Sequence, residues 1–192
     1  MSATYSTMLP LGTIAPDINL IDAIDGEMVT LSKYSDAKAI LIVFTANHCP
    51  YAKHVMPELI KIANEYQEKG LQIIAISSND IQTHPQDGPQ FMYEIAINDS
   101  NPFPYLYDED QSVARAFTAA CTPDLFLFDA DRKLVYRGQL DDSRPGNEIP
   151  LTGKYLREAL DQLLSGKKIT VEQKPSMGCN IKWKNGNEPG YF

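Results

Sequence analysis

Cysteine and histidine are scarce in this sequence, which contains three of each among 192 residues. The N-terminus lacks both the basic and the apolar segment of a signal peptide. Together with the odd number of cysteines, this argues against a secreted domain held by disulfides. We therefore expect reduced or catalytic thiols in the cytoplasm. No Cys-x-x-Cys pair is present, because Ala46 and Ala52 stand three positions before and after Cys49.

Long apolar segments and clusters of basic residues are also missing. The longest apolar runs are about six residues, whereas a helix needs roughly 20 to cross a bilayer, so no membrane partner is predicted. The formal charge is −8 and the main body has no lysine- or arginine-rich stripe. Because binding to nucleic acid depends on clustered cations, no nucleic-acid partner is predicted either. We also predict no cofactor and no metal site.

The apolar pattern that is present is typical of an α/β domain. Residues 39–44 and 71–77 are apolar runs of the kind found in strands buried on both faces, and apolar residues spaced by three or four from Tyr51 to Tyr66 predict a helix that ends at Gly70. A strand, a helix and a strand in this order form a βαβ unit with a parallel pair. The other predicted elements are hairpins around residues 25–26 and 129–133 and helices over 89–97, 113–117 and 152–164.

The composition changes after Gly166. Five lysines and two glutamates give residues 167–192 a charge of +3 and leave −11 for the preceding residues. We predict one domain over residues 1–165 and a tail over 166–192 that docks on the acidic domain. Ile181 and Trp183 are the expected anchors of this tail. The alternative is a mobile terminus.

Cys49 and Pro50 lie where the first buried strand meets the helix. Proline is favoured at the first helical position, so Cys49 is the expected N-cap. A thiolate at this position faces unpaired backbone N–H groups and the positive end of the helix dipole, which favours a nucleophilic sulfur. His48 could stabilise the thiolate, relay a proton, or be an ordinary loop histidine. The alternative for Cys49 is a small buried apolar side chain.

The stretch "VFTANHCPYAKHVMPELIKIANEY" (residues 43–66) resembles the strand, active-site turn and kinked helix of the thioredoxin superfamily. Residues 11–44 and 103–140 resemble the AhpC/TSA (redoxin) branch, which includes the peroxiredoxins. The resemblance covers roughly residues 9–165. It implies a thioredoxin-like α/β fold, in which helices flank a central mixed sheet, with an N-terminal β-hairpin extension and a C-terminal tail. Cys49 matches the first, nucleophilic cysteine of the family motif, and Pro57 matches the proline that bends the helix.

The same resemblance gives a role to Thr122 and Pro123. Pro123 matches the cis-proline that faces the nucleophile, and a cis peptide bond is tolerable only before proline. In this family the residue before that proline offers its backbone N–H and C=O to an extended partner chain. Thr122, Pro123 and Pro50 are therefore the predicted substrate-binding residues. The alternative for Pro123 is a trans proline at the start of an edge strand.

The resolving cysteine is left open by the sequence. Cys121, two residues before Pro123, and Cys179, in the tail, are both candidates, and each could instead be a structural thiol. A disulfide requires Cα atoms within about 7 Å, which the sequence does not show. Peroxiredoxins also carry a threonine three residues before the nucleophile, where this chain has Ala46, and an arginine for which Arg115 and Arg137 are candidates.

These residues together predict a thioredoxin-like thiol-disulfide oxidoreductase acting on protein thiols and disulfides through Cys49, with Cys121, Cys179 and His48 as further catalytic candidates. One alternative is a peroxiredoxin-like, antioxidant thiol peroxidase in which Cys121 or Cys179 resolves the oxidised Cys49. A copper chaperone is less favoured, because Lys53 stands where such proteins carry a second cysteine. A redox-inactive binding module is the fourth alternative. The electron donor is left open.

Overall fold

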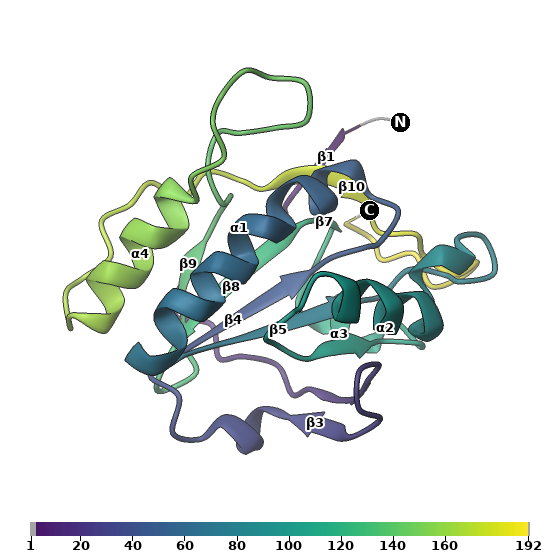
Figure 1. The fold of residues 1–192 in the computed structure, drawn as a ribbon, viewed down its shortest axis with the longest axis horizontal. Coiled ribbons are helices and arrows are strands. Elements are labelled where there is room, and N and C mark those ends of the chain that lie inside the picture. The colour runs from purple at the N-terminus through teal and green to yellow at the C-terminus, as the bar shows by residue number, and fades with distance from the viewer. Residues whose placement is uncertain (1–2, 192) are drawn as a thin grey trace.

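A mixed sheet of seven strands forms the centre of the computed structural model, which describes residues 3–191 (Figure 1). One of its inner strands, β4 (Ala39–Phe44), pairs in parallel with β5 (Leu71–Ser77) and antiparallel with β8 (Asp124–Asp129). The outer strands are β2 (Asn19–Asp22), β3 (Met28–Thr30), β6 (Tyr105–Tyr107) and β9 (Leu134–Arg137). The spatial order is β3-β2-β6-β5-β4-β8-β9. The predicted parallel pair and both predicted hairpins are confirmed.

Both faces of this sheet are covered, which explains why β4 is apolar along its whole length. The odd-numbered residues of β4 pack in one cluster with α1 (Pro50–Tyr66), α2 (Pro89–Asn98) and α4 (Lys154–Leu164). The even-numbered residues pack in a second cluster with α3 (Ser112–Ala116). Because successive side chains of a strand point to opposite faces, a strand between two helical layers needs apolar residues at every position.

The helix that follows β4 has the features that the sequence predicts. α1 carries Pro57 in its interior, which removes one helical hydrogen bond. It is followed by a 3-10 turn (Gln67–Lys69) and by Gly70, whose φ of 104° lies in the left-handed region. None of the helices within residues 3–191 has both the length and the apolar character needed to cross a bilayer.

A second, three-stranded sheet joins the two ends of the chain. It consists of β1 (Ala3–Tyr5), β10 (Met177–Asn180) and β7 (Cys121–Thr122), with β10 in the middle and both pairs antiparallel (Figure 1). The sequence did not predict this sheet. Strands of two to four residues are too short to show a period of two, so their pairing depends on the surrounding structure.

The segment after α4 is anchored on the domain by apolar side chains. Ile181 and Trp183 are 1% and 8% exposed, and both belong to the cluster that contains Val113 and Phe117. The backbone N–H of Ile181 also donates a hydrogen bond of 3.1 Å to the carbonyl oxygen of Ala120. This anchoring fixes β10 beside β7, at the end of the sheet where β4 leads into α1.

Candidate active site

Cys49 occupies the N-cap of α1, and Pro50 is the first helical residue, as predicted. The N-cap backbone is extended, with φ −75° and ψ 119°, and the Cys49 carbonyl accepts the first helical hydrogen bond from Lys53 at 3.0 Å. Proline suits the first position because its fixed φ is helical and its missing N–H has no intrahelical partner to lose. The sequence thereby places the sulfur at the junction of β4 and α1.

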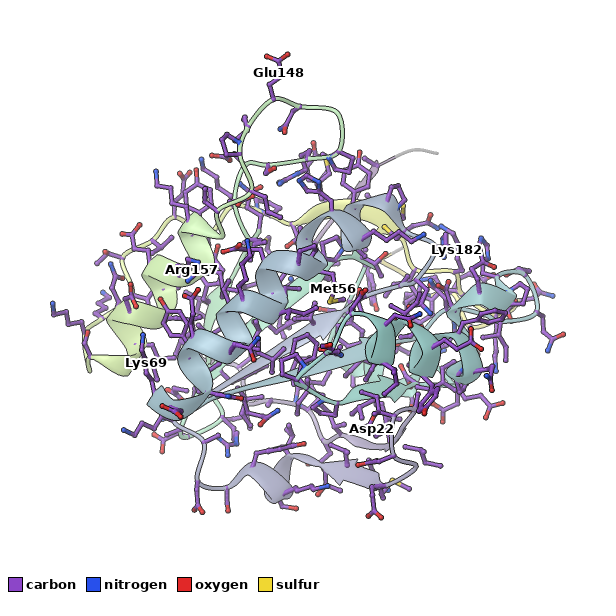
Figure 2. The ribbon with its side chains drawn as sticks, in the orientation of Figure 1. Asp22, Met56, Lys69, Glu148, Arg157 and Lys182 are labelled. Atoms are coloured by element: carbon purple, nitrogen blue, oxygen red, sulfur yellow. The ribbon has the colours of Figure 1, made fainter. Side chains whose placement is uncertain are left out.

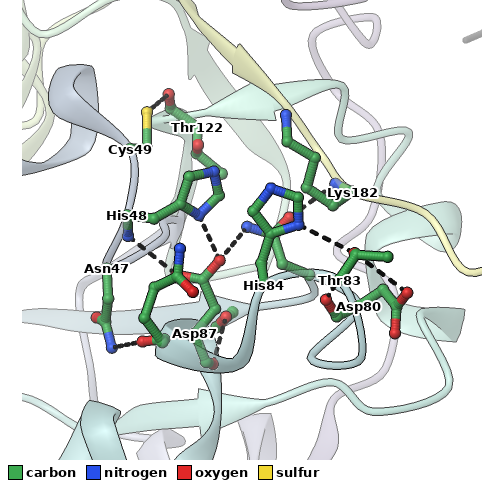
Figure 3. A network of polar contacts seen from close by, with 12 residues as sticks. Asn47, His48, Cys49, Asp80, Thr83, His84, Asp87, Thr122 and Lys182 are labelled. Carbon is green, nitrogen blue, oxygen red and sulfur yellow. Dashed lines mark hydrogen bonds and ion pairs between the residues drawn. The ribbon is translucent and has the colours of Figure 1, made fainter.

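The partner of the Cys49 sulfur differs from the one expected. No helix N–H donates to it; instead Sγ donates a hydrogen bond of 3.0 Å to the carbonyl oxygen of Thr122 (Figure 3). The side chain is also fully buried. In this state the sulfur is a hydrogen-bond donor, and the predicted contact with the helix amides is wrong. The physical reason is that the thiol carries a proton to donate, and the carbonyl before Pro123 accepts it.

Pro123 follows a cis peptide bond from Thr122, as the sequence predicts. The backbone of Thr122, however, is not open to a partner chain, because β10 of the same chain pairs with it and places Cys179 directly opposite. The fit is tight: a Cβ added to Gly178 would lie 1.9 Å from the Thr122 carbonyl oxygen. The site that was expected to hold an extended partner therefore already holds an extended segment with the sequence Met-Gly-Cys-Asn.

Cys179 is the cysteine that the structure brings to Cys49. The two side chains belong to one small buried cluster, in which Cys49 lies close enough to act on the pKa of Cys179. Burial raises the pKa of the Cys179 thiol to about 12, and the hydrogen bond with Cys49 and its charge act in the same direction. Cys179 is therefore a protonated thiol at neutral pH while Cys49 stays beside it.

Cys121 points away from this pair. It lies opposite Asn180 in the β7–β10 ladder, so its side chain is on the face opposite to that of Thr122 and Cys179. Its thiol is fully buried, contacts the carbonyl of Pro123 at 3.6 Å, and has a pKa raised mainly by burial. Cys121, one of the two candidates for the resolving cysteine, therefore lies on the other face of the β7–β10 ladder.

His48 is held by a buried carboxylate. Its backbone N–H donates to Asp87 Oδ1 at 3.0 Å, and its Nδ1 lies 2.5 Å from Asp87 Oδ2 (Figure 3). Burial alone would raise the pKa of Asp87, but the hydrogen bonds from His48 and Asn79 outweigh it and hold this pKa below its usual value. Within residues 3–191, His48 Nε2 is buried and has no hydrogen-bond partner. A histidine oriented through Nδ1 in this way keeps Nε2 available for proton transfer.

The sequence that forms this site matches a known protein family. The model of the AhpC/TSA family matches residues 11–137. The chain belongs to the AhpC/TSA family. Among curated relatives, it is 24% identical to the thiol-disulfide oxidoreductase ResA of Halalkalibacterium halodurans over 60% of this chain and 61% of that protein, so it spans about three-fifths of the length of that relative. It is also 24% identical to 1-Cys peroxiredoxin B of Oryza sativa subsp. indica over 93% of this chain and 80% of that protein.

Solved structures show the same fold for this AhpC/TSA chain. An uncharacterized conserved protein from Geobacillus kaustophilus is 53% identical, with a TM-score of 0.94 over 96% of this chain and 97% of that chain. The thioredoxin domain of a thiol-disulfide oxidoreductase from Bacteroides vulgatus is 22% identical, with a TM-score of 0.58 over 71% of this chain and 90% of that chain. The fold is thioredoxin-like, and the curated relatives that the chain resembles are named as thiol-disulfide oxidoreductases and peroxiredoxins.

The two arginines considered for a peroxidatic role have other partners in this AhpC/TSA chain. Arg137 is buried and forms a bidentate ion pair with Asp124. Its guanidinium carbon, Cζ, lies 3.7 Å from the centre of the Phe126 ring. Arg115 donates a hydrogen bond of 3.0 Å to the carbonyl of Asn187. For the copper alternative, no group of three or more His, Cys, Asp or Glu that could hold a metal ion occurs within residues 3–191.

Three residues of the site were missed by the sequence reasoning. Asp87 and Asn79 orient His48, and His84 stacks on it with ring centres 4.5 Å apart. His84 has a pKa lowered chiefly by burial and by the nearby charge of His48. The stretch "QTHPQDG" is a loop without periodicity, so only its density of polar residues near a predicted strand end could have marked it.

Proposed function

We propose that this AhpC/TSA chain is a thiol-disulfide oxidoreductase in which Cys49 is the nucleophile and Cys179 the resolving cysteine. The contact between these two thiols, beside the Thr122 carbonyl, is the observation that supports the proposal. A resolving thiol from the C-terminal tail takes the place of the second cysteine of a Cys-x-x-Cys motif, whose position is filled by Ala52. The similarity to ResA, named as a thiol-disulfide oxidoreductase, agrees with this reaction class.

The proposed reaction is a two-step exchange. The Cys49 thiolate attacks one sulfur of a partner disulfide, which forms a mixed disulfide and releases the other sulfur as a thiolate. Cys179 then passes its proton to the released partner thiolate, and its sulfur attacks Cys49 Sγ, which forms the Cys49–Cys179 disulfide and releases the second partner sulfur. The two protein thiols lose two electrons and two protons, and the partner disulfide gains them. An external dithiol reverses the exchange and restores both thiols in the reducing cytoplasm.

His48 is the proposed proton acceptor for Cys49. Its Nδ1 is fixed on Asp87, which leaves Nε2 as the free ring nitrogen, and it precedes the nucleophile directly in the chain. The Cys49 thiol donates a hydrogen bond to the Thr122 carbonyl, so activation requires that the proton leave this carbonyl and reach an acceptor. Asp87 orients the ring, as a positioning residue.

A thiol peroxidase is the second candidate function. The observation that favours it is the same pair of thiols, because a sulfenic acid formed on Cys49 by a hydroperoxide would condense with Cys179 to a disulfide and water. The likeness to 1-Cys peroxiredoxin B supports this candidate. The ion pair of Arg137 with Asp124 makes it weaker, since that guanidinium is already bound to a carboxylate.

The test is to map the cysteine pairing after mild oxidation with diamide. Peptide mass spectrometry should show a Cys49–Cys179 disulfide in the wild type and in Cys121→Ser, which is the matched control. The same disulfide should be absent from Cys49→Ser and Cys179→Ser. Steady-state reduction of a model disulfide such as oxidised glutathione should be lost in Cys49→Ser. A Cys49–Cys121 disulfide, or Cys49 unpaired after oxidation, would overturn the proposal.

The same variants separate the two candidate functions. Hydrogen peroxide is offered in place of the disulfide, with dithiothreitol as the reductant in both assays. Turnover of the disulfide without turnover of the peroxide supports the oxidoreductase. Peroxide turnover that is faster than disulfide turnover, and is lost in Cys49→Ser, selects the peroxidase instead.

A further inference from the structure

A cavity of about 660 Å³ lies between α1 and α2, on the sheet face that these helices cover. Ala52, Met56 and Ile60 form one wall; spaced by four, they lie on a single face of α1. Ile95 and Ala96 of α2 form the opposite wall. Figure 2 shows Met56 on the side of α1 that faces α2. Volumes of roughly 300 to 1,000 Å³ with mainly apolar walls are typical of small-molecule sites.

One end of this cavity borders the candidate active site. Ala46 and Ala52 line the cavity and also belong to the buried cluster that contains Cys49 and Cys179. These are the two positions at which a Cys-x-x-Cys pair with Cys49 would need a second cysteine. Since both residues are alanine, their short side chains leave space that a larger residue would occupy.

One hydrogen-bond acceptor in the cavity wall lacks a partner. The side-chain oxygen of Asn101 is buried and has no hydrogen-bond partner within the described part of the chain, while its Nδ2 donates to the Phe103 carbonyl at 3.1 Å. Burying a polar atom without a partner is unfavourable. A ligand that carries a hydrogen-bond donor would satisfy this acceptor.

The charged side chains that line the cavity are mostly cationic. Lys53 and Lys61 lie on the α1 side and Asp99 lies beyond the end of α2. Lys61 is 3.6 Å from Glu58, whereas no ion pair of Lys53 occurs within residues 3–191. The long apolar stem of a lysine can lie along an apolar wall while its ammonium group meets an anion at the mouth. The charge therefore favours a ligand with one negative group.

We propose that this cavity binds a small organic acid. Its apolar body lies against Met56 and Ile60, its carboxylate or sulfonate faces Lys53, and a donor group on the body meets Asn101. This binding site does not depend on the thiol chemistry proposed for Cys49, so the two proposals fail separately.

The test uses 8-anilinonaphthalene-1-sulfonate, which combines an apolar ring system, one sulfonate and one N–H donor. Its fluorescence should rise on titration into the folded, reduced protein, with one molecule bound per chain. Octanoate should displace it, while octan-1-amine, with the same chain and the opposite charge, should be at least about tenfold weaker. Equal displacement by both compounds would overturn the assignment of an acid site.

Three variants locate the binding. Met56→Trp fills the cavity and should abolish the fluorescence rise. Lys53→Glu should weaken binding at least about fivefold, and the matched control Lys167→Glu, an exposed lysine outside the cavity, should not change it. Because Lys53 is exposed, its variant stays folded, which circular dichroism checks. Unchanged affinity in both Met56→Trp and Lys53→Glu would show that the dye binds elsewhere and would overturn the proposal.

Discussion

The side chain of Asn79 accepts a hydrogen bond of 2.8 Å from the backbone N–H of Lys182. Its other end donates a hydrogen bond of 2.9 Å to Asp87, the carboxylate that holds His48. One buried amide thus joins the docked tail, which carries Cys179, to the group that orients His48. The position of the tail and the orientation of the histidine are coupled through this residue.

Replacing Asn79 by leucine should loosen both groups at once. The variant leaves the Lys182 N–H without its partner and removes one of the two hydrogen bonds to Asp87 Oδ2, which we expect to lower the free energy of unfolding by about 1–3 kcal/mol. It should also raise the rate at which iodoacetamide alkylates Cys179 in the native protein. Gln90→Leu, an exposed position on α2, is the control. Equal alkylation rates in wild type and Asn79→Leu would contradict the coupling.

Gly178→Ala should displace β10 from β7. The added Cβ would lie 1.9 Å from the Thr122 carbonyl oxygen, and backbone on that side has no room to yield. We expect a loss of about 1–3 kcal/mol or more, as for overpacking elsewhere, together with loss of the Cys49–Cys179 disulfide after oxidation. The control is Gly190→Ala, where a Cβ meets nothing within 4 Å. Thermal denaturation measures the loss of stability, and disulfide mapping measures the loss of the disulfide. A Cys49–Cys179 disulfide that forms normally in Gly178→Ala would contradict the prediction that β10 requires glycine at this position.

The stability should fall at alkaline pH, in part because of Cys179. The fold raises the pKa of this thiol from its ordinary 9.0 to about 12. Below pH 9 the thiol is neutral in the folded and unfolded states alike; between pH 9 and 12 only the unfolded state releases the proton, so the unfolded state gains stability. Urea denaturation across this range should show that the free energy of unfolding falls less steeply with pH for Cys179→Ala than for the wild type. If the free energies of both proteins fall in parallel, Cys179 is not the cause.

Arg137→Met should destabilise the protein strongly. Asp124 is fully buried, and the variant would leave its carboxylate without the guanidinium that neutralises it. Removing one partner of a buried ion pair costs about 3–5 kcal/mol. The urea midpoint should therefore fall, and it should recover in part in the double variant Arg137→Met/Asp124→Asn. Arg115→Met is the exposed control, for which we expect a change of less than about 0.5 kcal/mol.

The sequence could predict the parts of the site that depend on local patterns. β4 and α1 have clear apolar periodicity, so the position of Cys49 at their junction followed from the chain itself, and Pro50 fixed the helix start. The cis bond before Pro123 followed from the family resemblance. These features depend on residues that are neighbours in sequence, or on a motif that the family shares.

The remaining parts depend on contacts between distant segments. Asp87 reaches His48 from a short 3-10 turn (Pro85–Asp87), and nothing in the local pattern indicates that pairing. The register of β7 against β10 places Cys179, and not Cys121, on the face of Thr122, and a shift of one residue would exchange the faces on which they lie. Such a register is set by tertiary packing and could not be obtained from the residues of either strand.

The docked β10 strand has a consequence for biosynthesis. During translation, β4, α1 and the Thr122–Pro123 turn leave the ribosome before residues 177–180 are made. Until residues 177–180 emerge and dock, the Cys49 thiol and the free edge of β7 are open to other thiols and to other extended chains. Synthesis of this short segment is therefore the event that covers the proposed nucleophile.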